Sequence, residues 1–212
     1  MSGATCSELL IATSNPGKVK EIQLVLGDLR LRLRFLDHYP TLPSPIESGN
    51  TYAENAIIKA TEYARETGVC ALADDSGLEV DWLEGAPGLH SARFGKGSDA
   101  DRVQLLLSKL ASADHSDRNA RFVSVVAIVH PTGGVMNVAE GECRGRINYA
   151  PLGENGFGYD PIFVPDGYDL TFGQLPSDLK SKISHRAKAL ASTREFLTEL
   201  SGHRLTVSPT AS

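Results

Sequence analysis

Two adjacent carboxylates follow a short apolar run in the first half of the sequence. Asp74 and Asp75 come directly after residues 69–73, which predict a buried strand, and Ser76 and Gly77 come next. Neighbouring carboxylates repel each other unless a cation or a proton lies between them, and Mg²⁺ prefers oxygen ligands in the company of phosphate. A carboxylate here could also accept a proton from an attacking water. The alternative is a turn, for which Asp, Ser and Gly are the usual residues.

A further carboxylate and a lysine lie upstream of this pair. Glu47 follows a proline-rich connection, where its carboxylate could reach a metal. Asn55 and Lys59 are four residues apart on a predicted helix and therefore share one face. Glu54 is better explained as the capping-box partner of Thr51. The alternative for Lys59 is a solvated side chain, which is the commoner fate of a lysine on a helix.

The segment Thr13-Ser14-Asn15-Pro16-Gly17-Lys18 lies between a predicted strand and a predicted helix and could hold phosphate. Asn15 suits the N-cap and Pro16 suits the first helical position. A helix N-terminus presents free N–H groups and a positive dipole end, and Lys18 adds a full charge. The segment is not a P-loop, because it lacks the first glycine and the Ser or Thr that the Walker A motif requires. The alternative is plain helix capping.

Two motifs in the last third of the sequence could bind a base. Glycines flank an aromatic in Gly156-Phe157-Gly158-Tyr159-Asp160, which suits close stacking of a flat ring; the alternative is a turn whose aromatics pack in the core. Ser184 predicts an N-cap, which places His185 and Arg186 in the first helical turn. Cations there oppose the helix dipole, so they indicate an acceptor-rich ligand rather than an exposed basic turn.

Together these candidates form the inventory of a nucleotide site. They provide carboxylates for a metal, an aromatic ring for a base, and at least four cations. The cations are Lys18, Lys59, Lys180 and Arg186, with Arg93 as a weaker candidate. This inventory matches a nucleoside triphosphate bound with Mg²⁺.

The elements that must position these residues alternate along the chain. Apolar runs and helical spacings predict strands at 9–13, 31–35 and 69–73 and helices at 19–26, 51–64, 100–110 and 184–200. Residues 121–130 and 135–144, joined by a four-residue loop, predict an antiparallel hairpin, and residues 85–97 predict a long glycine-rich loop. This order predicts an α/β fold with a mixed sheet.

Composition bounds the class of protein. The chain has 212 residues, of which 41% are hydrophobic and 22% charged, which predicts one soluble globular domain. Lys and Arg number 21 against 26 Asp and Glu, so the net charge of −5 argues against a DNA or RNA partner. No apolar segment is long enough to span a bilayer, and the N-terminus has no signal-peptide pattern, so we expect no membrane partner.

The three cysteines are widely spaced and odd in number. Cys6, Cys70 and Cys143 form no C-x-x-C pair, which favours a reducing, cytoplasmic setting without a zinc site or a disulfide framework. We expect Cys70 to be a small buried hydrophobe.

Six motifs in this order resemble those of the inosine triphosphate pyrophosphatase family (HAM1/RdgB type), which hydrolyses non-standard purine nucleotides. They are Ile11–Lys18, Glu54–Ala56 with Lys59 and Ala60, Ala73–Leu78, Gly85–Gly88 with Ser91–Arg93, Phe157–Pro161 and Ile183–Arg186. The resemblance covers nearly the whole chain, from about Leu9 to Leu200.

The resemblance implies a fold and a reaction. The fold would be an elongated mixed β-sheet flanked by helices, with two lobes and a central cleft: one domain over 1–200 and a polar tail over 201–212, usually as a homodimer. The reaction would be hydrolysis of dITP, ITP and XTP to the monophosphate and pyrophosphate with Mg²⁺. The alternatives are a pyrophosphatase for other modified nucleotides and a nucleotide-binding module without catalysis.

The resemblance also implies roles for individual residues. Asp75 would be the proton acceptor, and Glu47 and Asp75 would bind the metal. Substrate contacts would come from Thr13, Ser14, Asn15, Pro16, Gly17, Lys18, Lys59, Ser76, Phe157, Gly158, Tyr159, Asp160, Lys180, His185 and Arg186. Residues 172–180 depart from the residues usual in the family, although Lys180 keeps its place.

Base selection should depend on the purine 6-position. Hypoxanthine and xanthine present a carbonyl acceptor there, whereas adenine presents an amino donor. Arg186 has donors only, so an amino group would leave it unpaired in a buried pocket.

Overall fold

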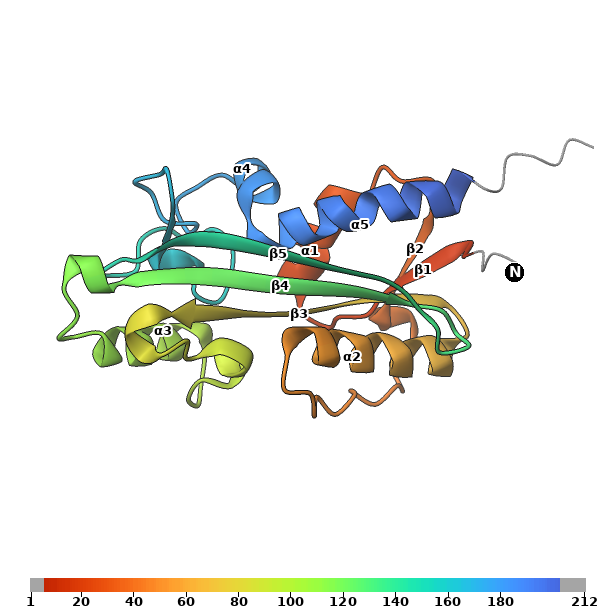
Figure 1. The fold of residues 1–212 in the computed structure, drawn as a ribbon, viewed down its shortest axis with the longest axis horizontal. Helices are drawn as coiled ribbons and strands as arrows, with labels where there is room; N and C mark the ends of the chain where they lie inside the picture. The colour runs from red at the N-terminus through yellow and green to blue at the C-terminus, as the bar shows by residue number, and fades with distance from the viewer. Residues whose placement is uncertain (1–5, 203–212) are drawn as a thin grey trace, which may run out of the picture.

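A computed structural model describes residues 6–202 and shows one six-stranded mixed sheet, in the order β2-β1-β3-β4-β5-β6 (Figure 1). The strands are β1 (Glu8–Ile11), β2 (Arg32–Phe35), β3 (Cys70–Val80), β4 (Asn119–Val129), β5 (Val135–Ile147) and β6 (Phe163–Pro165). β1 is parallel to β2 and β3, whereas β3, β4, β5 and β6 pair antiparallel. The predicted mixed sheet and the predicted hairpin are confirmed.

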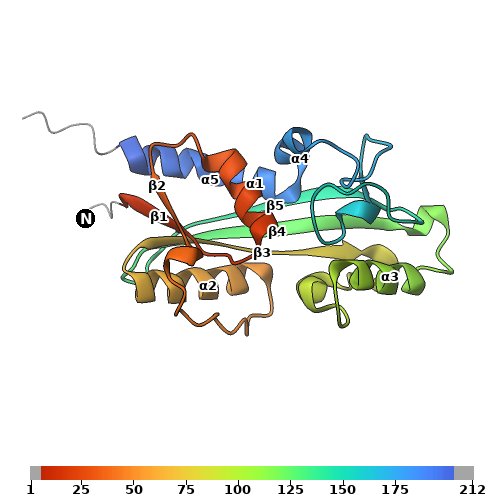
Figure 2. The ribbon, with the colours of Figure 1, turned by 180° about the vertical axis from the view of Figure 1, so that it is seen from behind.

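Helices cover both faces of the sheet (Figures 1 and 2). They are α1 (Pro16–Leu26), α2 (Tyr52–Thr67), α3 (Asp99–Lys109), α4 (Ser177–Ile183) and α5 (His185–Gly202). α1, α4 and α5 lie on one face, and α2 and α3 lie on the other. Successive side chains of β1 point to opposite faces of the sheet, so both faces are apolar and need a cover. Leu9 and Ile11 pack with α1 and α5, whereas Leu10 packs with α2.

The molecule is elongated because β3 and β4 run along most of its length (Figure 1). β1 ends at Ile11, which pairs with Leu72. The next residues of β3 therefore have β4 on one side and, within residues 6–202, no strand on the other. A separate apolar core around Phe122, Phe163 and Phe172 fills the far lobe, under α3 and α4. The two lobes thus adjoin where β1 stops.

The turn alternative for the paired carboxylates was wrong. Asp74 and Asp75 lie in the middle of β3, opposite Val126 and Val125 of β4, and the strand continues to Val80. The polar run stays in the sheet because β4 supplies an unbroken hydrogen-bonding partner and nearby cations neutralise both carboxylates.

Two helix starts follow the predicted caps. The Asn15 side chain accepts hydrogen bonds from the N–H groups of Gly17 and Lys18, at 2.9 and 3.1 Å. Thr51 caps α2 by accepting from the Glu54 N–H at 3.1 Å. The reciprocal half of the predicted capping box differs, because the Glu54 carboxylate accepts from the Asn50 N–H at 2.6 Å. The box closes one residue further back than expected.

Several segments differ from the predicted elements, among them β6, which was not predicted. The expected loop 85–97 contains a short 3₁₀ helix, Gly88–Arg93, and α4 was not predicted. The last helix begins at His185 as expected and extends to Gly202. The remaining tail, 203–212, lies outside the described residues.

The expectation of no disulfide was also wrong. Cys6 and Cys70 form a disulfide, with their Cα atoms 6.0 Å apart, whereas Cys143 is free and buried. Sequence spacing could not reveal this pair, because the two cysteines meet through the parallel pairing of β1 with β3. The cysteine argument for a reducing compartment therefore falls. None of the helices within the described residues could cross a membrane.

Candidate active site

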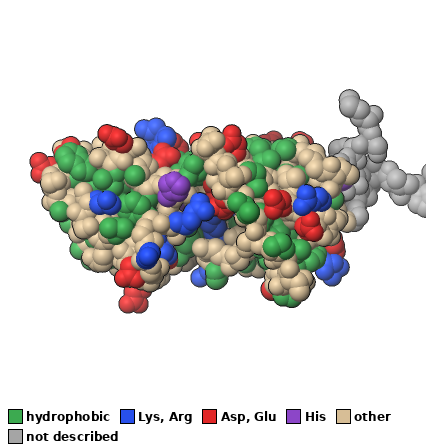
Figure 3. Space-filling model, turned by 90° about the horizontal axis from the view of Figure 1, so that it is seen from below, with side chains coloured by type: hydrophobic (Ala, Val, Ile, Leu, Met, Phe, Trp, Pro, Cys, Tyr) green, Lys and Arg blue, Asp and Glu red, His purple; other side chains and the backbone are tan. Residues whose placement is uncertain are grey.

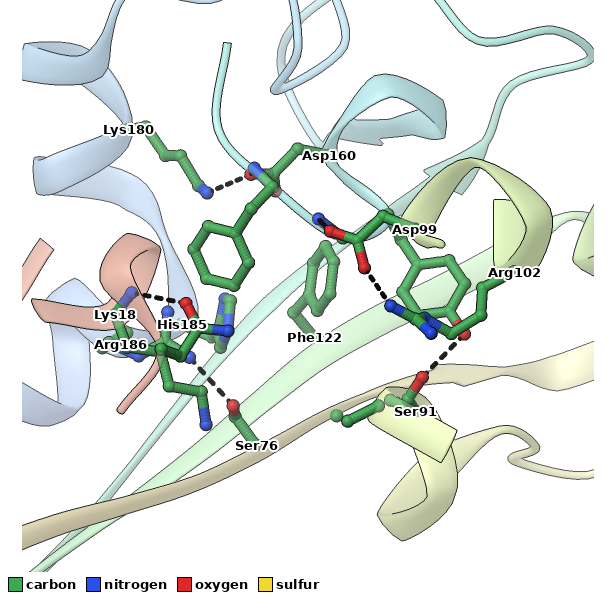
Figure 4. A pocket seen from close by; sticks show the side chains of 16 residues that line it. Lys18, Ser76, Ser91, Asp99, Arg102, Phe122, Asp160, Lys180, His185 and Arg186 are labelled. Atoms are coloured by element: carbon green, nitrogen blue, oxygen red, sulfur yellow. Dashed lines mark hydrogen bonds and ion pairs between the residues drawn. The ribbon is translucent and has the colours of Figure 1, made fainter. Parts of the chain in front are cut away.

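A hollow opens between the two lobes, beside the free edge of β3 (Figure 4). Side chains from both lobes line it. They include Asn15, Lys18, Ser76, Ser91, Asp99, Arg102, Phe122, Phe157, Tyr159, Asp160, Lys180, His185 and Arg186. Most of the residues predicted to contact substrate therefore meet in one place, although they are spread over the whole sequence.

Asp74 is the centre of a buried charge cluster on the α1 and α5 face of the sheet. Its carboxylate contacts the Lys18 ammonium at 2.5 Å and the Arg186 Nε at 3.1 Å, and it accepts a hydrogen bond from the Ser124 hydroxyl at 2.5 Å. Burial alone would raise the pKa of Asp74, but Arg186 and Lys18 outweigh burial and hold it well below 3.8. Asp74 is thus a fixed anion that orients two cations.

The cluster continues away from β3 through a second, partly buried anion. Glu21 of α1 pairs with Arg186 and lies 2.6 Å from the Lys180 ammonium, which also pairs with Asp160. Arg186 is 1% exposed and Lys180 is 5% exposed. The exposed basic turn considered for these cations is therefore excluded.

Asp75 belongs to a different cluster, on the α2 face. The Lys59 ammonium contacts Asp75 at 2.8 Å and Glu47 at 2.9 Å. Burial raises the pKa of Asp75 above 3.8, and Lys59 offsets only part of this effect. Asn55 donates to Asp75 at 3.4 Å and accepts from the Gly49 N–H at 2.8 Å, so it ties the chain near Glu47 to β3. The alternative considered for Lys59, a solvated side chain, is therefore wrong.

The two clusters lie on opposite faces because consecutive residues of a strand point to opposite sides. Lys18 joins them at the free edge of β3. It lies in contact with Asp74, and its charge favours the ionised forms of both Glu47 and Asp75, although burial keeps the pKa of Asp75 raised. Asp75 itself does not line the hollow. A ligand that touched both clusters would have to pass around the edge of the strand beside Lys18.

Aromatic side chains form the other part of the hollow. The Phe157 ring lies 5.0 Å from the Lys180 ammonium and 5.7 Å from the Arg186 guanidinium. His185 stacks on Phe122, with ring centroids 4.7 Å apart and an angle of 11° between the planes. Burial, and then Arg186, lower the pKa of His185 well below 6.5, so the imidazole is neutral at pH 7. Its Nδ1 is buried and has no partner among the described residues.

Tyr159 and Asp160 support this aromatic part from behind. The buried Tyr159 hydroxyl donates to the Ser91 carbonyl at 2.9 Å, and burial raises the pKa of Tyr159 to about 12. The Asp160 carboxylate accepts from the Phe157 N–H at 2.8 Å. The core-packing interpretation thus holds for Tyr159, whereas stacking of a base on Phe157, which lines the hollow, stays a prediction.

The segment 13–18 behaves first as a helix cap. The Asn15 side chain occupies the N–H groups of Gly17 and Lys18, which the phosphate hypothesis had left open for a ligand. The Thr13 hydroxyl accepts from the Asn15 N–H at 3.2 Å, and Ser14, Asn15 and Pro16 are exposed at the rim. Gly17 leaves room for Phe157, because a Cβ there would lie 2.3 Å from the ring.

Several residues of the site escaped sequence reasoning. They are Glu21, Asp99, Arg102, Phe122 and Ser124, whereas Asp74 and Ser91 stood in predicted motifs without an assigned role. Glu21 carried a signal, since it lies three residues after Lys18 on the predicted helix and so shares its face. Phe122 and Ser124 carried no such signal, because their contacts with His185 and Asp74 form only when the sheet and α5 are assembled.

Cations also gather on the surface. Figure 3 views the face covered by α2 and α3, and Lys and Arg side chains cluster near its middle. Arg93 is among the exposed cations near the α2-face cluster, where it lies 3.5 Å from Glu47. A chain with a net charge of −5 thus concentrates positive charge where the two lobes adjoin.

Known proteins are similar to this chain in sequence and in fold. The model of the Ham1 family matches residues 9–196. A dITP/XTP pyrophosphatase of Nostoc sp. is 49% identical over 185 residues, which cover 86% of this chain and 90% of that protein. Another from Deinococcus radiodurans is 48% identical over 184 residues, covering 86% and 89%. The structure of a HAM1 protein from Coxiella burnetii superposes with a TM-score of 0.81 at 40% identity, covering 91% of this chain and 98% of that one.

Proposed function

The chain belongs to the Ham1 family, and on this premise we propose that it is a dITP/XTP pyrophosphatase. It hydrolyses non-standard purine nucleoside triphosphates, including dITP, ITP and XTP, to the monophosphate and pyrophosphate. The observation that carries the proposal is the position of Lys18, between a buried aromatic hollow and a pair of carboxylates. A purine nucleotide with its base in the hollow would pass its phosphates beside Lys18 toward Asp75.

The reaction is a displacement at the α-phosphorus. Water attacks in line, its proton passes to the Asp75 carboxylate, and the bond from the α-phosphorus to the bridging oxygen breaks as pyrophosphate leaves. Lys18 and Lys59 bind the phosphates and neutralise charge on the leaving group. The raised pKa of Asp75 suits a general base, because it increases the affinity of the carboxylate for the proton of water.

Base selection follows from the donors around the hollow. Arg186 engages four of its five N–H groups with Asp74, Glu21 and Ser76. This fixes the guanidinium and leaves one N–H for a 6-carbonyl acceptor. Neutral His185 also lines the hollow. A 6-amino group would face a donor, which is the mismatch that rejects adenine nucleotides.

We propose Mg²⁺ as the cofactor, held by Glu47 and Asp75. The donor set fits, because these carboxylates converge on one ammonium, that of Lys59, and Mg²⁺ takes one or two carboxylates together with phosphate oxygens. When bound, the ion supplies charge neutralisation to the phosphates. We expect chelation with EDTA to abolish turnover and added Mg²⁺ to restore it, and Glu47→Gln to raise the Mg²⁺ concentration needed for half-maximal rate.

We also propose that the enzyme is a cytoplasmic homodimer that acts on free nucleotides rather than on DNA, RNA or a membrane. Membership of the family supports the homodimer, and the proposed free-nucleotide substrate supports the cytoplasmic location. Size-exclusion chromatography with light scattering tests the dimer.

A product assay tests the function. The protein is incubated with Mg²⁺ and dITP, XTP, dATP or dGTP, and the products are identified. Monophosphate and pyrophosphate from dITP and XTP, with little turnover of dATP and dGTP, are expected. Release of orthophosphate would indicate a γ-phosphatase, preference for modified pyrimidines would indicate a different substrate class, and binding without turnover would indicate a non-catalytic module.

A further inference from the structure

A carboxylate of α3 reaches across the hollow and holds the loop 156–160. Asp99, the first residue of α3, accepts a hydrogen bond at Oδ2 from the Gly158 N–H, with 2.8 Å between nitrogen and oxygen. The two residues are 59 positions apart in sequence. Figure 4 shows Asp99 on the side of the hollow away from Lys18 and Arg186. The bond therefore connects the α3 side of the far lobe to the loop that carries Phe157.

The same loop is anchored on its other side by Asp160. The N–H of Phe157 donates to Asp160, and Asp160 pairs with Lys180 of α4. Gly156 and Gly158 have φ angles of 76° and 61°, a left-handed conformation that favours glycine. Two successive N–H groups of the loop are thus held by carboxylates tied to different helices, one to α4 and one to α3.

Asp99 is fixed although its side chain is 48% exposed. Its other oxygen pairs with Arg102, which also donates to the Gly97 carbonyl at 2.8 Å. Asp99, Phe157 and Gly158 line both the hollow and a neighbouring groove between α3 and residues 151–161. The bond from Gly158 to Asp99 is therefore part of the wall that separates these two spaces.

We propose that Asp99 is a positioning residue for the purine end of the site. Without touching the substrate, its carboxylate holds Gly158 so that Phe157 keeps its place over the base. The inference rests on the proposed function, because that function assigns the hollow to a purine. It makes Asp99 a determinant of KM that acts equally on every purine substrate.

Two variants of Asp99 and one control test the proposal. Asp99→Ala removes the acceptor of the Gly158 N–H, whereas Asp99→Asn keeps a carbonyl acceptor. Asp101→Ala is the control, because it removes a carboxylate of the same helical turn that accepts from Ser98 and not from the loop. Hydrogen exchange of the amides of 156–160 is measured together with KM and kcat for dITP and XTP. Exchange reports the loop directly and requires no turnover.

Asp99→Ala should speed exchange of the loop about tenfold and raise KM for both substrates about tenfold, with kcat changed by less than about twofold. Asp99→Asn should stay within about threefold of the wild type, and Asp101→Ala should lower the melting temperature without changing loop exchange or KM. Unchanged exchange in Asp99→Ala would overturn the proposal, as would unequal KM changes for dITP and XTP, which would mean direct contact with the base. If the wild type hydrolyses neither nucleotide, the proposed function fails, whereas the exchange comparison still decides whether Asp99 holds the loop.

Discussion

Asp75 shows how burial can shift the pKa of one carboxylate in a strand. Burial disfavours its charged form, while Lys59 and Lys18 favour it, and the balance leaves a pKa above the ordinary value. Asp74, one residue earlier, has the opposite balance, because Arg186 and Lys18 dominate there. Two identical side chains thus differ in acidity, with the pKa of Asp74 held well below its ordinary value and that of Asp75 raised above it.

We expect Asp75→Asn to lower kcat by about three orders of magnitude, the size of a general-base contribution, while nucleotide still binds. In this variant Lys59 keeps Glu47 as a partner. Burial disfavours the charged form of Asp75, so replacing it with a neutral side chain should leave the melting temperature equal to or above that of the wild type. Turnover assays, calorimetric binding of dITP and thermal melts check this, with the exposed Asp81→Asn as control. Turnover near the wild-type rate would remove Asp75 from its role.

The pH dependence of the rate follows from the same shift. The carboxylate form of Asp75 is the active one, so kcat/KM should fall tenfold per pH unit below its folded-state pKa. Because that pKa is raised, the acid limb of the profile should begin above the ordinary value of 3.8. Profiles of kcat/KM between pH 4 and 9 measure it, and a rate that stays constant down to pH 4 would contradict the assignment.

At the scale of elements, the start of α5 must approach the sheet closely to place His185 and Arg186. Gly141 of β5 makes this approach possible. A Cβ at Gly141 would lie 2.2 Å from the His185 carbonyl oxygen and 2.5 Å from the Ala189 nitrogen, both of which are backbone atoms. A side chain at this point would push the whole first turn of α5 away from β5.

We therefore expect Gly141→Ala to destabilise the fold by about 1–3 kcal/mol and to weaken discrimination between dITP and dATP, because Arg186 moves with the helix. Gly134→Ala, in the loop of the same hairpin, is the control: its Cβ would meet nothing within 4 Å, and its effect should stay within about 0.5 kcal/mol. Denaturant melts and the ratio of kcat/KM for the two nucleotides measure both effects. Equal stability of the two variants would show that α5 can shift freely.

At the scale of the whole molecule, Asp74 ties together three elements that the sequence places far apart. It contacts Lys18 of α1 and Arg186 of α5 from the middle of β3. Removing one member of a buried ion network leaves the others uncompensated, which costs about 3–5 kcal/mol. An exposed pair of the same kind, Asp28 with Arg194, is screened by solvent and contributes little to stability.

We expect Asp74→Asn to lower the free energy of unfolding by about 3–5 kcal/mol at pH 7, and the exposed Asp28→Asn to leave it almost unchanged. The pKa of Asp74 is lower in the fold than in the unfolded chain, so its stabilisation is present above pH 3.8 and is lost as the pH falls through the folded value. Urea melts at several pH values check both statements. A difference between wild type and Asp74→Asn that stayed constant well below pH 3 would contradict this pKa.

The sequence by itself determined the strand and helix order, the caps at Asn15 and Thr51, and most of the residues that line the hollow. These features depend on local chemistry, since apolar spacing, capping side chains and glycine positions act within a few residues. It also determined the family, because six motifs occur in one order. The turn considered as the alternative at Asp74 was wrong, because local preference there favours a turn whereas pairing with β4 continues the strand.

Only the tertiary structure decided where those residues stand relative to one another. It placed Asp74 and Asp75 on opposite faces of one strand, joined Cys6 to Cys70, and brought Asp99 to Gly158 across the hollow. Each of these contacts depends on strand pairing or on the packing of the lobes, so it involves residues that exert no influence on one another in the unfolded chain. Propensity and pattern report the neighbourhood along the chain, whereas a site at a sheet edge is made by neighbours in space.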